Sequence, residues 1–185
     1  MNDLPSRQFE FLAHELKLMI NGRWWRAISI WFASATWILV TYRFERFMFL
    51  RLGRIYGLLR LFLLPFLFLT RPWRSNCELH YRADIGRGLK LLHPELGIVI
   101  NGNAIVGDHL TLTGGNCIGG RAHLQQGDIR IGENVLLGAN AVVLGPLRIG
   151  SNVTIGAGAV VIHDADDGAT LAGVPARPIT SLTLN

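Results

Sequence analysis

The sequence predicts a mainly β fold, a left-handed parallel β-helix of hexapeptide repeats preceded by an N-terminal α-helical region. Two observations lead to this fold class. Aliphatic residues recur every six positions between residues 79 and 161, usually followed by glycine. The first third of the chain has helical spacing of its apolar residues instead.

The repeat keeps a single register over most of its length. Its thirteen aliphatic positions are Leu79, Ile85, Leu91, Ile100, Val106, Leu112, Ile118, Ile131, Leu137, Val143, Ile149, Ile155 and Val161. Each hexad supplies a short strand that points its aliphatic side chain into a narrow core, and a turn that glycine or asparagine permits. Three hexads close a triangular coil, and stacked coils pair as parallel strands about 4.8 Å apart. About four to five coils are expected in the β-helix.

The register is interrupted twice. Leu91 and Ile100 are nine residues apart rather than six, and the insertion contains His93. Ile118 and Ile131 are thirteen residues apart, which we interpret as two hexads of twelve residues plus one inserted residue (twelve plus one). The intervening GGRAHLQQGD lacks the aliphatic pattern. Insertions in a solenoid are extruded as loops, and loops on a rigid scaffold commonly carry function. Both interruptions are therefore candidate edges of an active site.

Residues 1–75 are predicted to form a hydrophobic, basic α-helical region. Residues 1–74 hold 11 Lys/Arg and 4 Asp/Glu, a balance of +7, whereas residues 75–185 hold 7 and 9, a balance of −2. The first helical pattern starts after Ser6 and is expected to stop at Asn21-Gly22. The uncharged runs 27–42 and 61–70 have sixteen and ten residues. Both are shorter than the ~20 residues that comfortably span a bilayer.

A basic stripe is predicted in this region. Arg43, Arg46, Arg51 and Arg54 fall on one arc of a continuous helix, with apolar residues around the rest. Such a helix would lie in a membrane interface, where arginines meet anionic headgroups. The alternative is a helical bundle that buries its apolar residues in an oligomer contact, and the two can coexist.

Composition also bounds the location and partners. Cys77 and Cys117 belong to no C-x-x-C pattern and suggest neither a disulfide framework nor a zinc site. The N-terminal residues lack the pattern of a signal peptide. We expect a cytoplasmic protein, peripheral to the inner membrane, and no nucleic-acid partner.

The segments DIGRGLKLLHPELGIVI and IGAGAVVIHDADDGATLAGVPARPI resemble the serine acetyltransferase group of hexapeptide acyltransferases. Within it, GIVINGNAIVGDHLTLTGGNCIG and IGENVLLGANAVVLGPLRIGSNVTIGAGAVV are most similar to colanic-acid-type exopolysaccharide O-acetyltransferases. The likeness covers roughly residues 76–180. We expect a catalytic β-helix domain at 76–172 and a C-terminal tail at 173–185. Because a prism of this kind leaves flat faces, we also expect a homotrimer, or a dimer of trimers.

The resemblance implies acetyl transfer from acetyl-CoA, as co-substrate, to a hydroxyl group. His93 would be the general base, oriented by Glu78, the carboxylate fifteen residues upstream. Peptide N–H groups around Gly114 and Gly115 would stabilise the oxyanion. The acetyl-CoA contacts would be Gly119, Gly120, Ala139 and Ala157 along the pantetheine arm, with Arg177 near the nucleotide. Candidates for contacting the acceptor are His109, His123 and Asp128.

The acceptor is where the chain departs from serine acetyltransferases. The Arg-His-Pro segment that handles their amino acid is absent, and QGDIRI, around Asp128, stands in its place. The predicted acceptor is therefore a sugar hydroxyl of an exopolysaccharide precursor, lipid-linked or nucleotide-linked. Serine O-acetylation in cysteine synthesis and a non-catalytic β-helix scaffold are the alternatives. The spacing of His93, His109 and His123, 16 and 14 residues, does not fit a zinc site, so no metal is expected.

Overall fold

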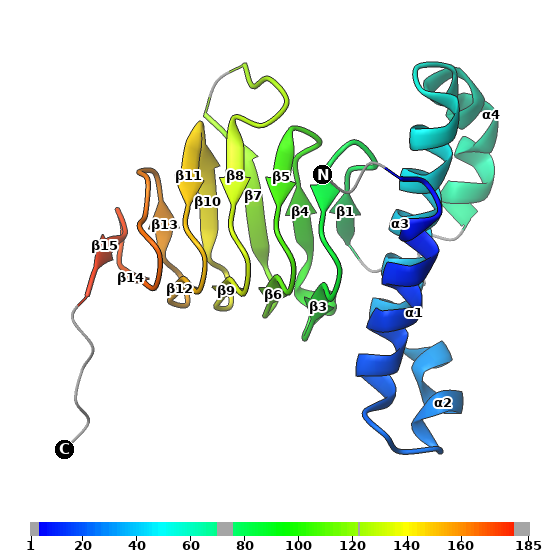
Figure 1. Ribbon diagram of the computed structural model, residues 1–185, viewed down its shortest axis with the longest axis horizontal. Helices are drawn as coiled ribbons and strands as arrows, with labels where there is room; N and C mark the ends of the chain where they lie inside the picture. Colours follow the sequence, from blue (N-terminus) through cyan, green and yellow to red (C-terminus); the bar gives the residue numbers. More distant parts are fainter. Residues whose placement is uncertain (1–3, 70–75, 122, 180–185) are drawn as a thin grey trace.

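The computed structural model describes residues 4–69, 76–121 and 123–179 and consists of a parallel β-helix with helices standing at its N-terminal end (Figure 1). The β-helix makes about 4 turns. The predicted fold class, a β-helix of hexapeptide repeats preceded by helices, is confirmed.

The helical elements are α1 (Arg7–Ile20), α2 (Arg26–Ser29), η1 (Ile30–Phe32), α3 (Ser34–Leu52) and α4 (Ile55–Leu69). The first helix ends where the sequence predicts, because Asn21 and Gly22 adopt positive φ angles of 48° and 69°. Gly53, with φ 56°, ends α3, and α4 turns back beside α3 (Figure 1).

Three sheets form the faces of the prism. Face A contains β1 (Cys77–Leu79), β4 (Ile98–Ile100), β7 (Asn116–Gly120), β10 (Val142–Gly145) and β13 (Val160–Val161). Face B contains β2 (Asp84–Ile85), β5 (Ala104–Val106), β8 (Ile129–Ile131) and β11 (Leu147–Ile149). Face C contains β3 (Lys90–Leu91), β6 (Thr111–Leu112), β9 (Leu136–Leu137), β12 (Thr154–Ile155), β14 (Thr170–Ala172) and, antiparallel to β14, β15 (Arg177–Pro178).

The core of the prism is the aliphatic register itself. All thirteen predicted positions are buried, none with more than 8% of its surface exposed. Their burial confirms the assignment of each hexad's first residue to the inside. Burying an aliphatic side chain of this size contributes about 1.5–3 kcal/mol, so the repeated pattern is the main source of the β-helix's stability.

The first interruption of the register is observed as predicted. The chain needs six residues from Leu112 on face C to Ile118 on face A, but nine from Leu91 to Ile100 between the same faces. The three additional residues form a bulged corner that contains the short helix η3 (Pro94–Leu96).

The second interruption is larger than predicted. Ile100 and Val106 are six residues apart and pair with Ile118 and Ile131, which are thirteen apart. The loop between β7 and β8 therefore adds seven residues to one corner, and the reading of twelve plus one is wrong. The spacing of aliphatic residues does not show on which face each one lies, so it does not give the length of this loop.

The predicted basic stripe is also wrong. Arg43 and Arg46 are 0% and 4% exposed, and both face the end of the β-helix rather than solvent or lipid. Arg54 lies beyond the break at Gly53, so it does not share a helix with the others. The physical reason is that the first coil presents backbone carbonyl groups that have no preceding strand to bond to, and arginine supplies donors for them.

Arg43 is the centre of this contact and uses all five of its N–H donors. Its Nε and Nη2 groups donate to the carboxylate of Glu15 on α1. Nη1 donates to Gln8 Oε1 at 3.1 Å and to the carbonyl oxygen of Ile85 at 2.8 Å. Nη2 also donates to the carbonyl oxygen of Gly86 at 2.6 Å. One buried side chain thus joins α1, α3 and the first coil.

Neighbouring groups complete the same contact. Tyr42 Oη donates to the carbonyl oxygen of Ala83 at 2.9 Å and accepts the N–H of Ile85 at 3.3 Å. Burial raises the pKa of Tyr42 to about 12, so the hydroxyl keeps its proton and can donate. The N–H of Leu89 donates to Glu15 Oε1 at 3.1 Å. The edge of the first coil is therefore capped by polar side chains from the helices.

Within the described residues, no single helix is long and apolar enough to cross a membrane. The pair Arg26–Phe32 and Ser34–Leu52 meets the length and composition criteria only when taken together, and it is bent by 77°. Much of α3 is buried within the protein, including Ile38, Leu39 and Tyr42.

Replacing Arg43 with methionine is expected to lower the free energy of unfolding by about 3–5 kcal/mol, because Glu15 would remain charged and buried without its partner. Urea denaturation followed by circular dichroism measures the change. Arg51→Met, which removes an exposed arginine from the same helix, serves as the control and should change stability by no more than about 0.5 kcal/mol. Equal losses in the two variants would contradict the assigned role of Arg43.

Candidate active site

His93 lies at the corner between faces C and A, directly after β3 and before η3. Its side chain is exposed, and its backbone N–H donates to the carbonyl oxygen of Thr113 in the next coil at 2.8 Å. The hydrogen bond fixes the backbone while the three-residue insertion lifts the imidazole off the regular coil. The imidazole is thus accessible on a rigid edge, which suits a general base.

Two contacts hold this corner from either side. Cys77 Sγ, at the start of β1, donates to the carbonyl oxygen of Pro94 at 3.2 Å, and burial raises the pKa of its thiol to about 11. Ser34 Oγ, the first residue of α3, donates to Glu95 Oε1 at 2.7 Å. The hydrogen bond from Ser34 lowers the pKa of Glu95, so the carboxylate is ionised beside the histidine.

Glu78 lies on the segment next to this corner but does not bond to the histidine. It is exposed in the middle of β1, one residue after Cys77, which contacts Pro94. No hydrogen bond or ion pair joins Glu78 to His93 in the part of the chain that the structure describes. The predicted orienting role of Glu78 remains a prediction that requires its side chain to turn towards the imidazole.

The sequence does not single out Glu95, whose carboxylate pKa is lowered mainly by the hydrogen bond from Ser34. The available signal was its place inside the three-residue insertion, two residues after the histidine. Its partner Ser34 is 61 residues away in the chain, and a contact of that separation leaves no local pattern.

A column of small residues continues from His93 along the same corner. The carbonyl oxygen of Gly114 accepts the N–H of Asn140, and that of Ala139 accepts the N–H of Gly158, both at 2.8 Å. Ala139 and Ala157 therefore occupy corresponding turns of successive coils, in line with His93. An extended, narrow ligand could follow this edge, as the resemblance implies for the pantetheine arm.

Asn116 organises the middle of the column. Its side chain is buried, accepts the N–H of Gly114 at 2.8 Å and donates to the carbonyl oxygen of Gly138 at 2.7 Å. The N–H of Gly114 thus already has a partner in this structure. The role of peptide N–H groups around Gly114 and Gly115 in stabilising an oxyanion stays a prediction. Because Asn116 is buried, its amide must satisfy its hydrogen bonds within the protein.

Two of the predicted acetyl-CoA contacts lie elsewhere on the subunit. Gly119 and Gly120 end β7 at the opposite edge of face A, paired with Leu144 and Gly145. Arg177, by contrast, is exposed on β15 and pairs with Ala172 at the C-terminal end of the same column. A single chain therefore does not bring all five predicted contacts together.

The predicted acceptor contacts are also dispersed. His123 is exposed on the long loop between faces A and B. Asp128 closes that loop, because its Oδ2 accepts the N–H of Gln125 at 2.7 Å. His109 occupies a turn between faces B and C with φ 62°, beside His14 of α1 at 6.1 Å between ring centres. Asp128 and His109 thus have structural contacts, and none of the three lies at the corner of His93.

The three faces differ in what they present outward. The outward row of face A consists of Glu78, Val99, Cys117, Val142 and Val160, which are in register across five strands. The row of face B consists of Asp84, Ile105, Arg130 and Arg148. The row of face C consists of Lys90, Thr111, Leu136, Thr154 and Thr170. Face A is the apolar one, and both extruded loops stand at its edges.

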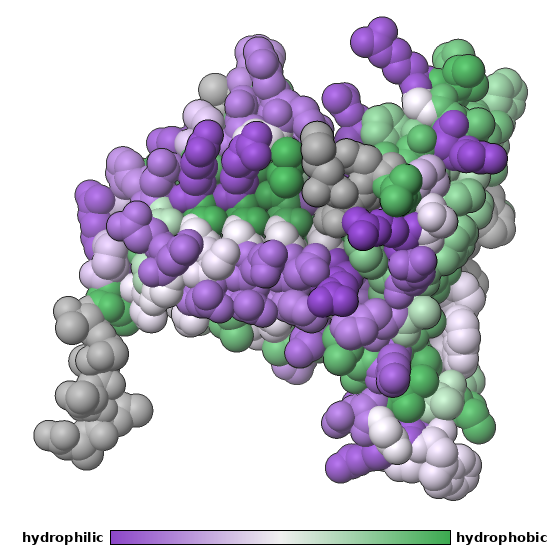
Figure 2. Space-filling view, in the orientation of Figure 1, coloured by the Kyte–Doolittle hydropathy of each residue, from purple (hydrophilic) through white to green (hydrophobic). Residues whose placement is uncertain are grey.

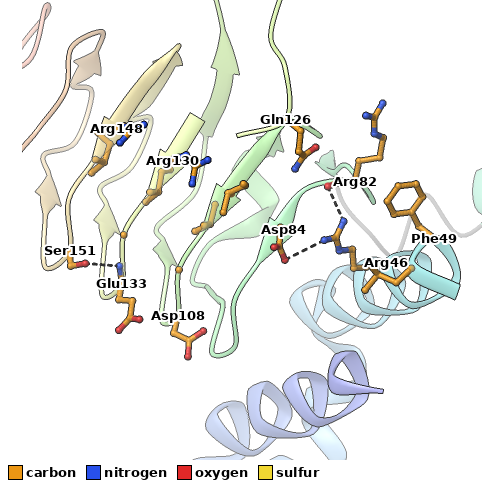
Figure 3. Close-up of a pocket in the computed structure, with 17 residues that line it drawn as sticks. Arg46, Phe49, Arg82, Asp84, Asp108, Gln126, Arg130, Glu133, Arg148 and Ser151 are labelled. Atoms are coloured by element: carbon orange, nitrogen blue, oxygen red, sulfur yellow. Dashed lines mark hydrogen bonds and ion pairs between the residues drawn. The ribbon is translucent and has the colours of Figure 1, made fainter. Parts of the chain in front are cut away.

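A hollow of about 1140 Å³ lies on face B, between the β-helix and α3. Arg82, Arg130 and Arg148 border it together with Gln126 of the long loop, while Arg46 is paired with Asp84 (Figure 3). Face B is opposite the corner that carries His93, so a molecule bound in this hollow cannot reach the histidine of the same chain. We therefore place the candidate site at the corner and not in the larger hollow.

No cluster that fits a metal ion is found among residues 4–69, 76–121 and 123–179, where no group of three or more His, Cys, Asp or Glu side chains converges. The chemistry available at the corner is proton transfer by His93 next to an ionised carboxylate.

The sequence is similar to those of known acetyltransferases. A family described as bacterial transferase hexapeptide (six repeats) matches residues 128–163. Serine acetyltransferase 1 of Arabidopsis thaliana is 41% identical over 104 residues, covering 55% of this chain and 32% of that protein. The serine acetyltransferase of Helicobacter pylori is 35% identical over 107 residues, covering 57% of this chain and 62% of that protein. The chain thus spans about a third of the plant relative's length.

A solved structure extends the likeness to the helices. The serine acetyltransferase of Neisseria gonorrhoeae in complex with serine aligns with a TM-score of 0.75 and 26% identity, over 95% of this chain and 70% of that chain. The β-helix fold and the hexapeptide repeats together indicate a hexapeptide-repeat acyltransferase of the serine acetyltransferase type.

Proposed function

We propose that this protein is an O-acetyltransferase that moves the acetyl group of acetyl-CoA to the hydroxyl of a small acceptor. The observation that carries the proposal is the corner of His93, where an exposed histidine stands at the head of a column of small residues. The similarity to serine acetyltransferases supports both the reaction and the donor.

His93 would act first as base and then as acid. A hydroxyl with a pKa near 15 does not attack a thioester unaided, so the imidazole takes its proton as the oxygen–carbon bond forms. When the tetrahedral intermediate collapses, the carbon–sulfur bond breaks and the imidazolium returns the proton to the CoA sulfur. A carboxylate, Glu78 or the ionised Glu95, stabilises the imidazolium between the two steps.

L-serine is the acceptor that the comparisons favour, because the matching relatives are named serine acetyltransferases. A saccharide hydroxyl of an exopolysaccharide precursor is the second candidate. It is favoured by the long loop, where Asp128 bonds to Gln125 and no Arg-His-Pro segment is present to receive an amino acid. The two acceptors differ in charge, and the assay below separates them.

His93→Ala is expected to lower the acceptor-dependent release of CoA thiol roughly 10²–10⁴-fold, the usual contribution of a positioned acid–base group. Thiol release from acetyl-CoA is followed with a chromogenic disulfide, with L-serine or a saccharide precursor as acceptor. His163→Ala, which removes another exposed histidine from a turn, is the matched control and should keep the wild-type rate. Serine-dependent release would support serine acetylation, and release only with saccharides would support the second candidate.

Full activity of His93→Ala would contradict the proposed base. A wild-type chain that neither releases thiol with any acceptor nor binds acetyl-CoA in calorimetry would support the scaffold alternative instead.

We further propose that the protein acts as a homotrimer associated through face A. The outward row of this face is apolar after Glu78, and Val99 is 42% exposed in the single chain. Burial of face A between subunits would bring the corner of His93 in one subunit near the long loop of another. Gly119 and Gly120 would then approach the column of small residues from a neighbouring chain, which a single chain does not achieve.

Val142→Arg is expected to dissociate the trimer, because it places a charge in the centre of the apolar row. Sedimentation velocity measures the assembly. Thr154→Arg adds the same charge to face C and should leave the trimer intact. A monomeric wild-type chain, or a trimer unaffected by Val142→Arg, would contradict the assignment of face A.

A further inference from the structure

The helix α4 has its polar edge turned inward. Tyr56 is buried, and its Oη donates to Glu45 Oε1 of α3 at 3.2 Å. Arg60 Nε donates to the same carboxylate oxygen at 2.9 Å. The ring of Tyr56 also packs edge-on against Tyr81, with 5.2 Å between centres. The helix is therefore attached to the rest of the protein by polar and aromatic groups.

The opposite side of α4 is apolar and uncovered. Eight of its large apolar side chains, 37% to 80% exposed, form what we call the α4 face: Ile55, Leu58, Leu59, Leu61, Phe62, Leu64, Phe68 and Leu69. Apolar residues gather at this end of the molecule, whereas hydrophilic residues cover most of the visible side of the β-helix (Figure 2). Soluble monomers rarely expose contiguous apolar surface of this extent, so the α4 face is expected to be covered by a partner.

The charges around this face indicate the partner. The chain has no acidic residue between Glu45 and Glu78, a stretch that contains six arginines. Arg60 is used by Glu45, whereas Arg51 and Arg54 are exposed beside the start of the helix. An apolar face next to exposed cations complements an apolar layer under anionic headgroups.

A second copy of the chain fits this surface less well. A symmetrical contact would bring Arg51 and Arg54 of one copy towards the same residues of the other, and no acid on the stretch could neutralise them. An anionic bilayer neutralises the same arginines. The 15 residues of α4 reach about 22 Å, less than the ~30 Å hydrocarbon core, and Pro65 lies within them. The helix is therefore suited to lie in the membrane surface rather than to cross it.

We propose that the α4 face docks the protein onto an anionic lipid bilayer, with the apolar side chains in the interface and Arg51 and Arg54 at the headgroups. This surface differs from the arginine stripe that the sequence suggested, since Arg43 and Arg46 are buried against the β-helix. The proposal is independent of the acetyl acceptor and of the catalytic residues.

The test is flotation of the full chain with vesicles of phosphatidylcholine alone or mixed with phosphatidylglycerol. The chain is expected to float with the anionic vesicles, and less so at raised salt, because ions screen the arginines. Phe62→Glu, at the most exposed side chain of the α4 face, should weaken partitioning about tenfold or more. Leu136→Glu adds the same charge at a 39% exposed leucine of face C and should float like the wild type.

Circular dichroism and the melting temperature verify that both variants are folded. The proposal is overturned if the wild-type chain fails to float with anionic vesicles, or if the two glutamate variants partition equally. It is also overturned if Phe62→Glu leaves flotation unchanged but alters the mass of the chain in sedimentation, because the α4 face is then a contact between subunits.

Discussion

The buried ion pair between Arg43 and Glu15 is the interaction on which the rest of the architecture depends. A β-helix that begins in water would leave the backbone groups of its first coil open to pairing with another chain. Here the arginine bonds to the carbonyl oxygens of Ile85 and Gly86, and Glu15 accepts the N–H of Leu89. The helices therefore terminate the sheet, and the same α3 that carries Arg43 begins with Ser34, which holds Glu95 at the corner of His93. Helix α3 therefore both terminates the β-helix and positions the segment that carries the candidate base.

The molecule divides its tasks among its surfaces. Face A is apolar and is bordered by both extruded loops, which suits assembly around a shared site. Face B is charged and adjoins the hollow beside α3, and face C exposes mainly threonine and leucine. The α4 face is at the end of the prism, attached by Glu45 to α3, so membrane docking there would not obstruct the corner of His93. The proposed assembly surface, the candidate catalytic edge and the proposed docking surface thus lie on separate parts of the molecule.

The sequence predicts the features that repeat along the chain, but not those that depend on contacts between distant residues. All thirteen aliphatic positions are buried because an inward side chain every six residues is a local property of the coil. The three-residue insertion at His93 was visible for the same reason. The size of the second loop does not follow from the spacing of aliphatic residues, because Ile118 lies in face A and Ile131 in face B. Arg43 bonds to Ile85, 42 positions away, and Ser34 bonds to Glu95, 61 positions away. These contacts form only when the helices dock on the first coil, so no local pattern predicts them.

Hydrogen–deuterium exchange of wild type and Arg43→Lys, resolved by mass spectrometry, tests whether the helical cap fixes the first coil and the corner of His93. Lysine keeps the charge but lacks the planar fork that bonds to Glu15 and to two carbonyl oxygens at once. We expect faster exchange in residues 77–97, which include His93, while the coil formed by β10, β11 and β12 keeps its protection. Unchanged exchange in residues 77–97, or an equal loss of protection in every coil, would contradict it.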